Sequence, residues 1–273
     1  MRRSLFSATL LALTFAVSGR AQTARPDSVE IPDRQLFHRS DLYVAGAFAL
    51  GTAALLPVDK HLAQLIRDDD LIGNGTLHRL SSTARFFGGP GPLIIGPAMY
   101  VVGRYAHVPR MAELAVHGTE AVLVGGAVAT VIKFTAGRER PFVNADTNPH
   151  DFRFLSGARD DTRRSFPSGH TTAAFSAAAA VVAETHEWWP RSTWYVAPLM
   201  YGGATAVGLS RMYDDQHWAS DVLMGAAIGT FAGLKTVRFN HTHTGNAIDT
   251  ILLGMRVVPA PDGVALAWSS SAP

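Results

Sequence analysis

The chain of 273 residues contains no cysteine. Disulfide bonds, thiolate catalysis and cysteine-ligated zinc are therefore excluded. An excess of one charge is also lacking, because 24 lysines and arginines are balanced by 22 aspartates and glutamates, which leaves a net charge of +2. This balance gives no reason to expect nucleic acid as a partner. The alternation of apolar and polar residues that indicates strands is nearly absent before residue 250, which favours an all-α fold.

The first residues carry the features of a secretory signal peptide. Two arginines precede the apolar run LFSATLLALTFAV, and Gly19 and Ala21 then occupy suitable positions before a cleavage site. The run is short for a membrane span, so we expect residues 1–21 to be removed. An uncleaved membrane anchor is the alternative. With the signal peptide removed, the mature chain would begin outside the cytoplasm.

Apolar blocks separated by polar clusters make up most of the remaining chain. After a polar lead-in over residues 22–40, the blocks are rich in Ala, Gly, Val and Leu and lie at about 41–56, 92–103, 111–134, 171–184, 194–209 and 219–234. They predict an all-α bundle of about six core helices over residues 41–240, broken at FFGGPGP. In the tail, residues 241–273, two apolar runs flank Pro-Asp-Gly and predict a small β-hairpin.

The length of these blocks leaves open whether they cross a membrane. A span needs about 20 apolar residues, and several blocks are shorter before a charge or a proline interrupts them. Block 41–56 is expected not to cross, because a charged stretch follows it at once. Small residues let helices pack closely in lipid or in water, so a soluble bundle is the alternative to a membrane-embedded one.

The stretch RSFPSGH ends at His170, directly before an Ala-rich run that forms helix readily. The first turn of a helix leaves N–H groups without internal acceptors and presents positive charge. Ser168 and Gly169 are small enough to let an anion approach this backbone, with His170 at its edge. The stretch therefore predicts an anion-binding turn, although a plain capped helix start is compatible with the same residues.

Two further segments add cations and a histidine–aspartate pair. Lys133 lies inside an apolar block, where an unpaired ammonium is costly, and Arg140 follows about two helical turns later. In SRMYDDQHWASD, His217 and Asp221 are four residues apart and so share a helical face. A carboxylate bonded to one ring nitrogen leaves the other free as a nucleophile or base. Arg211 adds a guanidinium suited to phosphate oxygens.

Together the three segments hold the groups that phosphoryl transfer needs when Mg²⁺ does not neutralise the phosphate. Their motifs are K-x6-RP from Lys133, PSGH from Pro167 and SR-x5-H-x3-D from Ser210. They resemble the signature motifs of the type 2 phosphatidic acid phosphatases, whose superfamily includes class A acid phosphatases and vanadium-dependent haloperoxidases. The resemblance covers about residues 90–236 and implies an all-α bundle whose motifs meet at one end.

The resemblance also implies a role for each motif residue. His217 would attack phosphorus and form a phosphohistidine, and Asp221 would orient it. His170 would protonate the leaving alcohol and then activate the hydrolytic water. The phosphate oxygens would be held by Lys133, Arg140, Ser168, Gly169 and Arg211. No metal or other cofactor is implied.

These features predict a phosphoric monoester hydrolase of the bacterial cell envelope, with its active site facing the periplasm. The expected substrates are phosphomonoesters or diphosphates of lipids, and membrane association is expected with them. A soluble periplasmic acid phosphatase acting on small phosphate esters is the main alternative, and a vanadium-dependent haloperoxidase is a further one. The first two are distinguished by comparing a lipid phosphate with p-nitrophenyl phosphate.

Four other positions carry weaker signals. Asp214 and Asp215 place two negative charges beside the expected nucleophile, so they either face away or pair with an arginine such as Arg211 or Arg138. His241 and His243 form only a weak metal pair, because two histidines without a third ligand rarely bind a metal specifically.

Overall fold

The computed structural model describes residues 35–67, 74–143, 147–243, 245–260 and 263–268. The predicted signal peptide and most of the lead-in lie outside these ranges. The α-helices are α1 (Arg39–Leu55), α2 (Asp59–Ile66), α4 (Gly75–Gly88), α5 (Gly91–Tyr105), α6 (Pro109–Ala136), α7 (Gly169–Trp188), α8 (Thr193–Tyr213), α9 (Ala219–Thr242) and α10 (Ala247–Leu252). Short 3-10 helices are η1 (Leu56–Val58), η2 (Pro141–Val143), η3 (Ser156–Ala158), η4 (Asp161–Arg163) and η5 (Pro190–Ser192).

The expected helical fold is confirmed, but six helices is an undercount. The six apolar blocks fall in α1, α5, α6, α7, α8 and α9, whereas α2, α4 and α10 are additional; α2 and α4 are more polar, and α10 is short. Two short strands, β1 (Met255–Ala260) and β2 (Gly263–Trp268), pair antiparallel. The turn between them lies outside the described residues, so the hairpin stays a prediction.

Local signals in the sequence set the ends of the helices that carry the motifs. Ser168 is the N-cap of α7, and its hydroxyl oxygen accepts from the backbone N–H of Thr171. Helix α6 ends at Gly137, which has a left-handed φ of 58°. A Cβ atom there would lie 1.9 Å from the carbonyl oxygen of Arg153, so only glycine fits. These two ends bring the loop after Lys133 next to the loop before Ser168, where the backbone N–H of Ser165 donates to the carbonyl oxygen of Arg138.

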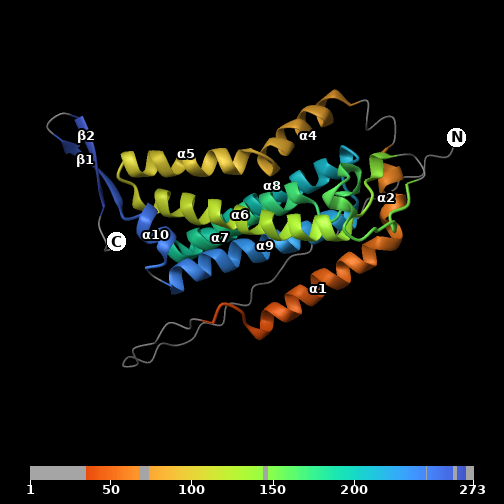
Figure 1. Ribbon diagram of the computed structural model, residues 1–273, viewed down its shortest axis with the longest axis horizontal. Coiled ribbons are helices and arrows are strands. Elements are labelled where there is room, and N and C mark those ends of the chain that lie inside the picture. Colours follow the sequence, from red (N-terminus) through yellow and green to blue (C-terminus); the bar gives the residue numbers. More distant parts are fainter. Residues whose placement is uncertain (1–34, 68–73, 144–146, 244, 261–262, 269–273) are drawn as a thin grey trace. The chain divides into compact units, whose positions relative to one another are not determined.

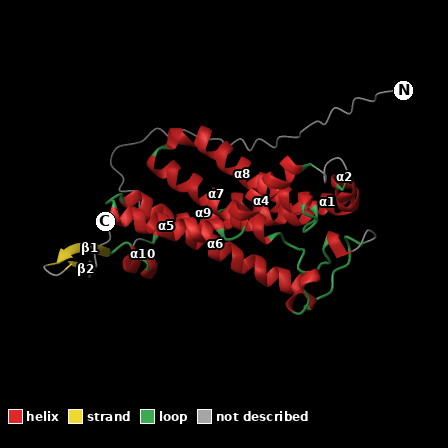
Figure 2. Ribbon diagram, turned by 90° about the horizontal axis from the view of Figure 1, so that it is seen from above, coloured by secondary structure: helices red, strands yellow, loops and turns green. Residues whose placement is uncertain are grey.

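Helices α6, α7 and α9 pack side by side, as both views show (Figure 1, Figure 2). Close approach depends on small residues, as the Ala- and Gly-rich composition predicts. A Cβ on Gly229 of α9 would lie 2.4 Å from the carbonyl oxygen of Thr172 of α7, and one on Gly225 would lie 2.6 Å from that of Ser168. The start of α9 is thus fixed directly against the start of α7.

Three helical stretches of the described residues are long and apolar enough to cross a membrane: Arg39–Ile66, Pro109–Ala136 and Ala219–Thr242. A fourth span results if α4 and α5, which meet at a bend of 57°, count as one. The first stretch differs from the expectation that block 41–56 does not cross. The helical path continues past the block through Asp59, whose carboxylate is fully buried in the protein.

Candidate active site

The three sequence motifs converge where α6 ends and α7 and α9 begin. The Nζ atom of Lys133, on α6, donates to the carbonyl oxygens of Arg164 at 2.6 Å and Pro167 at 2.8 Å. Its Cε atom lies 3.9 Å from where a Cβ on Gly169 would stand. The loop before α7 is joined to α9 because the backbone N–H of Ser168 donates to the carbonyl oxygen of Asp221 at 3.0 Å. Residues separated by almost ninety positions therefore meet at one place.

His217 is buried at this junction, with 4% of its side chain exposed. Its Nδ1 atom lies 2.6 Å from the carbonyl oxygen of Ser165. Because a carbonyl oxygen only accepts, Nδ1 carries the hydrogen and Nε2 keeps a free lone pair. Burial, together with the positive charges of Lys133 and Arg140, lowers the pKa of His217 to about 3. The imidazole is thus neutral and nucleophilic at ordinary pH.

Asp221 orients this imidazole differently from what the sequence predicts. Its Oδ2 atom is 3.8 Å from Nδ1 of His217, which is beyond hydrogen-bond distance. The same oxygen accepts from the hydroxyl of Ser165 at 2.5 Å and from the backbone N–H of Trp218 at 2.9 Å. Asp221 therefore acts on His217 through Ser165, whose carbonyl holds the ring.

Arg138 and Asp59 complete the support beneath His217, and sequence reasoning did not find this pair. The Arg138 guanidinium is fully buried; it donates to Asp221, to Ser220 at 2.7 Å and to Asp59 at 2.7 Å. Asp59 also accepts from the backbone N–H of Ser220 at 3.0 Å. One buried cation thus bridges two buried carboxylates. The sequence does place Arg138 between the motif residues Lys133 and Arg140. Nothing in the sequence, however, predicts that Arg138 contacts Asp59.

Arg140 and Arg211 each retain a donor for a ligand. Arg140 donates to Gln216, and Arg211 donates to Asp214 at 2.8 Å. The Nε atoms of both arginines are buried and have no hydrogen-bond partner among the residues that the structure describes. Buried donors are rarely left unpaired, so these two atoms are available to a bound acceptor.

The two aspartates beside His217 are both paired with arginines. Asp214 is bonded to Arg211 and accepts from the hydroxyl of Ser81 at 2.7 Å. Asp215, which has a left-handed φ of 60°, is bonded to Nε of Arg67 at 2.7 Å. The first pairing is one that the sequence allowed, whereas Arg67 lies outside every motif. Neither carboxylate is left as a free negative charge at the site.

Ser168 and Gly169 form the start of α7, as expected of an anion-binding turn. The hydroxyl of Ser168 accepts from both the N–H and the hydroxyl of Thr171, and so keeps its own hydrogen to donate. The first N–H groups of α7 have no acceptor within the helix. Since the side chain of Lys133 lies against Gly169, an anion here would meet both the helix dipole and an ammonium.

His170 lies in the first turn of α7, against the break between α4 and α5. A Cβ on Gly89 would stand 3.2 Å from its Nε2 atom, and one on Gly88 would stand 2.9 Å from its carbonyl oxygen. The glycines of FFGGPGP, read from the sequence only as a helix break, therefore make room for this histidine. Burial and the charges of Arg211 and Lys133 lower its pKa to about 4.

The site thus defines a class of protein: a helical bundle with a neutral buried imidazole close to a lysine and two arginines. Residues 115–244 match the model of the PAP2 superfamily. The chain therefore carries a PAP2 superfamily domain, and the resemblance predicted from its three motifs is confirmed.

Individual proteins of known structure or name also resemble this chain. A lipid A 1-phosphatase of Porphyromonas gingivalis is 28% identical over 169 residues, which are 62% of this chain and 32% of that protein. The chain thus spans about a third of the length of this relative. The crystal structure of a transmembrane PAP2 type phosphatidylglycerolphosphate phosphatase from Bacillus subtilis is 19% identical, with a TM-score of 0.55. The match covers 76% of this chain and 98% of the Bacillus chain. This similarity supports the helical fold described above.

Proposed function

We propose that the protein hydrolyses phosphomonoesters or diphosphates of lipids at the cell envelope, through a phosphohistidine on His217. The observation that carries the proposal is the pair of buried, unpaired Nε donors of Arg140 and Arg211 in one cluster with Lys133. Three cations and a helix N-terminus suit the oxygens of a phosphate dianion. They supply the charge stabilisation that phosphoryl transfer otherwise takes from a metal ion.

The proposed reaction has two steps. In the first, the Nε2 lone pair of His217 forms a bond to phosphorus while the bond to the leaving oxygen breaks, and His170 gives that oxygen a proton. In the second, His170, now neutral, takes a proton from water as the water oxygen attacks phosphorus and His217 departs. His170 is thereby returned to its protonated form. Lys133, Arg140 and Arg211 hold the phosphate oxygens throughout.

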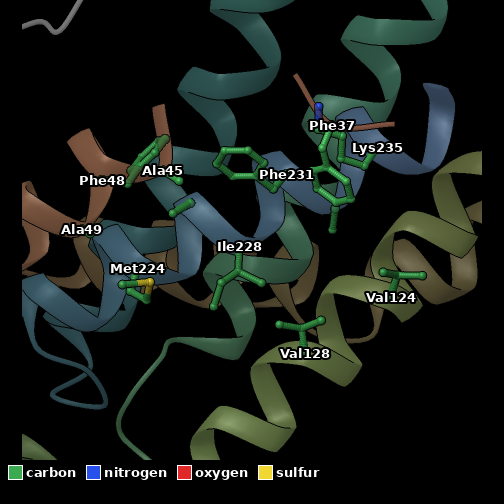
Figure 3. Close-up of a pocket in the computed structure, with 12 residues that line it drawn as sticks. Phe37, Ala45, Phe48, Ala49, Val124, Val128, Met224, Ile228, Phe231 and Lys235 are labelled. Carbon is green, nitrogen blue, oxygen red and sulfur yellow. The ribbon is translucent and has the colours of Figure 1, made fainter. Parts of the chain in front are cut away.

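An apolar groove beside the site supports a lipid as the substrate. A cavity of about 340 Å³ lies between α1, α6 and α9, and apart from Lys235 its lining is apolar (Figure 3). Val128 of α6 is five residues from Lys133, which is about 8 Å along the helix. Figure 3 shows Met224, Ile228 and Phe231 of α9 along the same groove. Hydrocarbon chains of a lipid fit such a lining.

The candidate membrane spans and the relative's name point in the same direction. Helices that cross a bilayer bring a headgroup to the end of the bundle where the motifs lie. The Porphyromonas relative is named as a lipid A 1-phosphatase, so phosphorylated lipids are the first substrates to test. We infer that the active site faces the periplasm. With the predicted signal peptide, this orientation needs the stretch Arg39–Ile66 to stay on the periplasmic side, although its length and composition allow it to cross.

The test is phosphate release by the purified full chain in detergent. Phosphatidate, phosphatidylglycerol phosphate, lipid A and p-nitrophenyl phosphate are compared, with and without EDTA. The proposal expects turnover of a lipid phosphate to exceed that of p-nitrophenyl phosphate and to survive EDTA. Preference for p-nitrophenyl phosphate favours a soluble-type acid phosphatase, and loss of turnover in EDTA contradicts a metal-independent reaction.

A further inference from the structure

A second cluster of ionisable side chains lies far from the motifs, inside the same three helices. Its four members come from α6, α7 and α9 and offer two imidazole nitrogens and two carboxylate oxygens: Glu113, His117, Glu184 and His241. His117 and Lys133 are both on α6, 16 residues apart, which is about 24 Å along the helix axis. The cluster therefore has no part in holding the phosphate.

The four ligand atoms are close enough to share one ion. They all lie within 4.8 Å of one another. A tetrahedral zinc ion with bonds of about 2.0–2.1 Å separates its ligands by roughly 3.4 Å. His117 and Glu184 are in direct contact and must move apart to reach this separation, whereas the partly exposed Glu113 and His241 can reach it by side-chain rotation. His117 and Glu184, in contrast, are buried with 2% and 0% of their side chains exposed.

The hydrogen bonds of His117 set which of its nitrogens faces the cluster. Its Nε2 atom lies 3.1 Å from Oδ1 of Asp249, so the carboxylate fixes the hydrogen on Nε2. Asp249 is itself held by Asn246, which donates to its Oδ2 at 2.8 Å and accepts from its N–H at 2.9 Å. A carboxylate behind a ligating histidine is the usual outer support of a metal site. It leaves the Nδ1 lone pair of His117 directed at Glu184.

Positive charge is then required between these groups. Nδ1 of His117 is in direct contact with one oxygen of Glu184, and Nε2 of His241 lies 2.9 Å from the other. A lone pair facing a carboxylate repels it unless a cation lies between them. Either two protons or one divalent ion supplies this charge, and both leave the same net charge among the three carboxylates of Glu113, Glu184 and Asp249. Two imidazoles with two carboxylates form a ligand set suited to zinc.

We propose that Glu113, His117, Glu184 and His241 form a binding site for a divalent transition-metal ion, with zinc as the best fit. The ion joins α6, α7 and α9 at the ends remote from the phosphate-binding residues. It is a structural ion rather than a catalytic one. The sequence offered His241 and His243 only as a weak metal pair, and the ring of His243 is stacked on Phe239.

The experiment measures zinc binding to the full chain in detergent, purified with a tag that contains no histidine and dialysed against EDTA. Titration with Zn²⁺ alone is expected to show one equivalent bound with a Kd of about 1 µM or tighter. Co²⁺ is expected to give the intense visible absorption of a tetrahedral site. Bound zinc is also expected to raise Tm.

The variants separate a metal ligand from a hydrogen-bonding residue. His241→Gln keeps a donor for Glu184 but has no imidazole nitrogen, and Glu113→Gln removes a ligand from a partly exposed position. Each is expected to raise the Kd for Zn²⁺ at least about 100-fold, whereas Asp249→Asn, acting through His117, is expected to raise it about 10- to 100-fold. His243→Gln is the matched control and is expected to bind as the parent protein does.

Two results overturn the proposal. One is binding of less than a fifth of an equivalent of Zn²⁺ by the correctly folded parent protein. The other is a Kd unchanged by His241→Gln. Phosphatase activity of His241→Gln is measured alongside and is expected to persist at 25 °C, because this site is remote from the phosphate.

Discussion

His217 donates its Nδ1 hydrogen to the carbonyl oxygen of Ser165, 2.6 Å away. This bond fixes the tautomer of the imidazole and aims Nε2 away from the loop before α7. The hydroxyl of the same serine is bonded to Asp221, so one residue transmits the position of the carboxylate to the ring. The proposed nucleophile, His217, is therefore held by a backbone carbonyl oxygen. Asp221 supports it indirectly, because Asp221 is bonded to Ser165 and not to His217.

Replacing His217 tests the proposed nucleophile. His217→Ala is expected to lower phosphate release at least about 1,000-fold, because no other group at the site forms the covalent intermediate. Tm is expected to change little, since the imidazole makes a single hydrogen bond. The matched control is His243→Ala, which should retain full turnover. Substantial turnover by His217→Ala contradicts the assignment.

Asp221 and Asp59 flank the same buried guanidinium, and this makes them a matched pair for testing the support of His217. Asp221→Asn and Asp59→Asn each replace one charged acceptor of Arg138 while the other carboxylate stays, and each should lower the free energy of unfolding by about 1.5–3 kcal/mol. Only Asp221 also holds Ser165. Asp221→Asn is therefore expected to lower kcat at least about tenfold more than Asp59→Asn does. This factor corresponds to about 1.4 kcal/mol in the activation free energy.

Denaturant unfolding and steady-state kinetics below the unfolding transition separate these two effects. Equal losses of kcat in the two variants would show that Arg138, rather than Ser165, transmits the effect of Asp221. A variant that loses stability alone, as expected of Asp59→Asn, shows that the buried charges do not set the chemistry by themselves.

Anion binding is expected to change the protonation of His170. In the empty site, burial and the charges of Arg211 and Lys133 lower its pKa to about 4. A bound dianion offsets those charges, so the pKa of His170 rises and binding takes up protons near pH 6. Sulfate is the right probe, because it has no proton of its own to release at this pH.

Calorimetry of sulfate binding in buffers with different ionisation enthalpies measures this uptake. The parent protein is expected to take up as much as about one proton, and His170→Asn almost none. Proton release by the parent protein, or equal uptake by both, contradicts the role of His170 as the group that protonates the leaving oxygen.

The groove between α1, α6 and α9 is tested by filling it. Ile228→Trp places an indole in the cavity and displaces hydrocarbon; losing contact with two methylene groups costs about 1.6 kcal/mol, or roughly tenfold in kcat/KM. This loss is expected for a long-chain phosphatidate and not for p-nitrophenyl phosphate. Val131→Trp is the control, because Val131 is on α6 but exposed and outside the groove. Equal losses on both substrates contradict a lipid-binding groove.

The fold was predictable where the sequence pattern is local. Apolar blocks rich in alanine and glycine marked α1 and α5 to α9, because an apolar run is a property of neighbouring residues in the sequence. The turn at Ser168 was visible for the same reason, since a cap and a helix dipole depend on adjacent residues. Polar helices such as α2 and α4 gave no comparable pattern and were missed.

The motif residues of the site were predictable, but their partners were not. Lys133, His170 and His217 are residue types with few roles in apolar surroundings. Asp59 and Arg67, in contrast, are common surface residues that reach the site only because α2 folds back against the motif loops; their bonds to Arg138 and Asp215 join positions 79 and 148 residues apart.

The second cluster was hidden in the sequence for the same physical reason. His117 and Glu184 lie in different apolar helices, 67 residues apart, and His241 follows at the end of a third. Each one alone is typical of a polar contact inside a bundle. Only the packing of α6, α7 and α9 shows that their ligand atoms meet.

Trapping the covalent intermediate tests the central claim most directly. In His170→Ala, p-nitrophenyl phosphate still transfers its phosphoryl group, because p-nitrophenolate leaves without a proton, but the second step lacks its base. A burst of about one equivalent of p-nitrophenolate is expected, with acid-labile, alkali-stable phosphate on the peptide that contains His217. Phosphate released at the rate of p-nitrophenolate, with no phosphate bound to His217 at any time, would contradict the account.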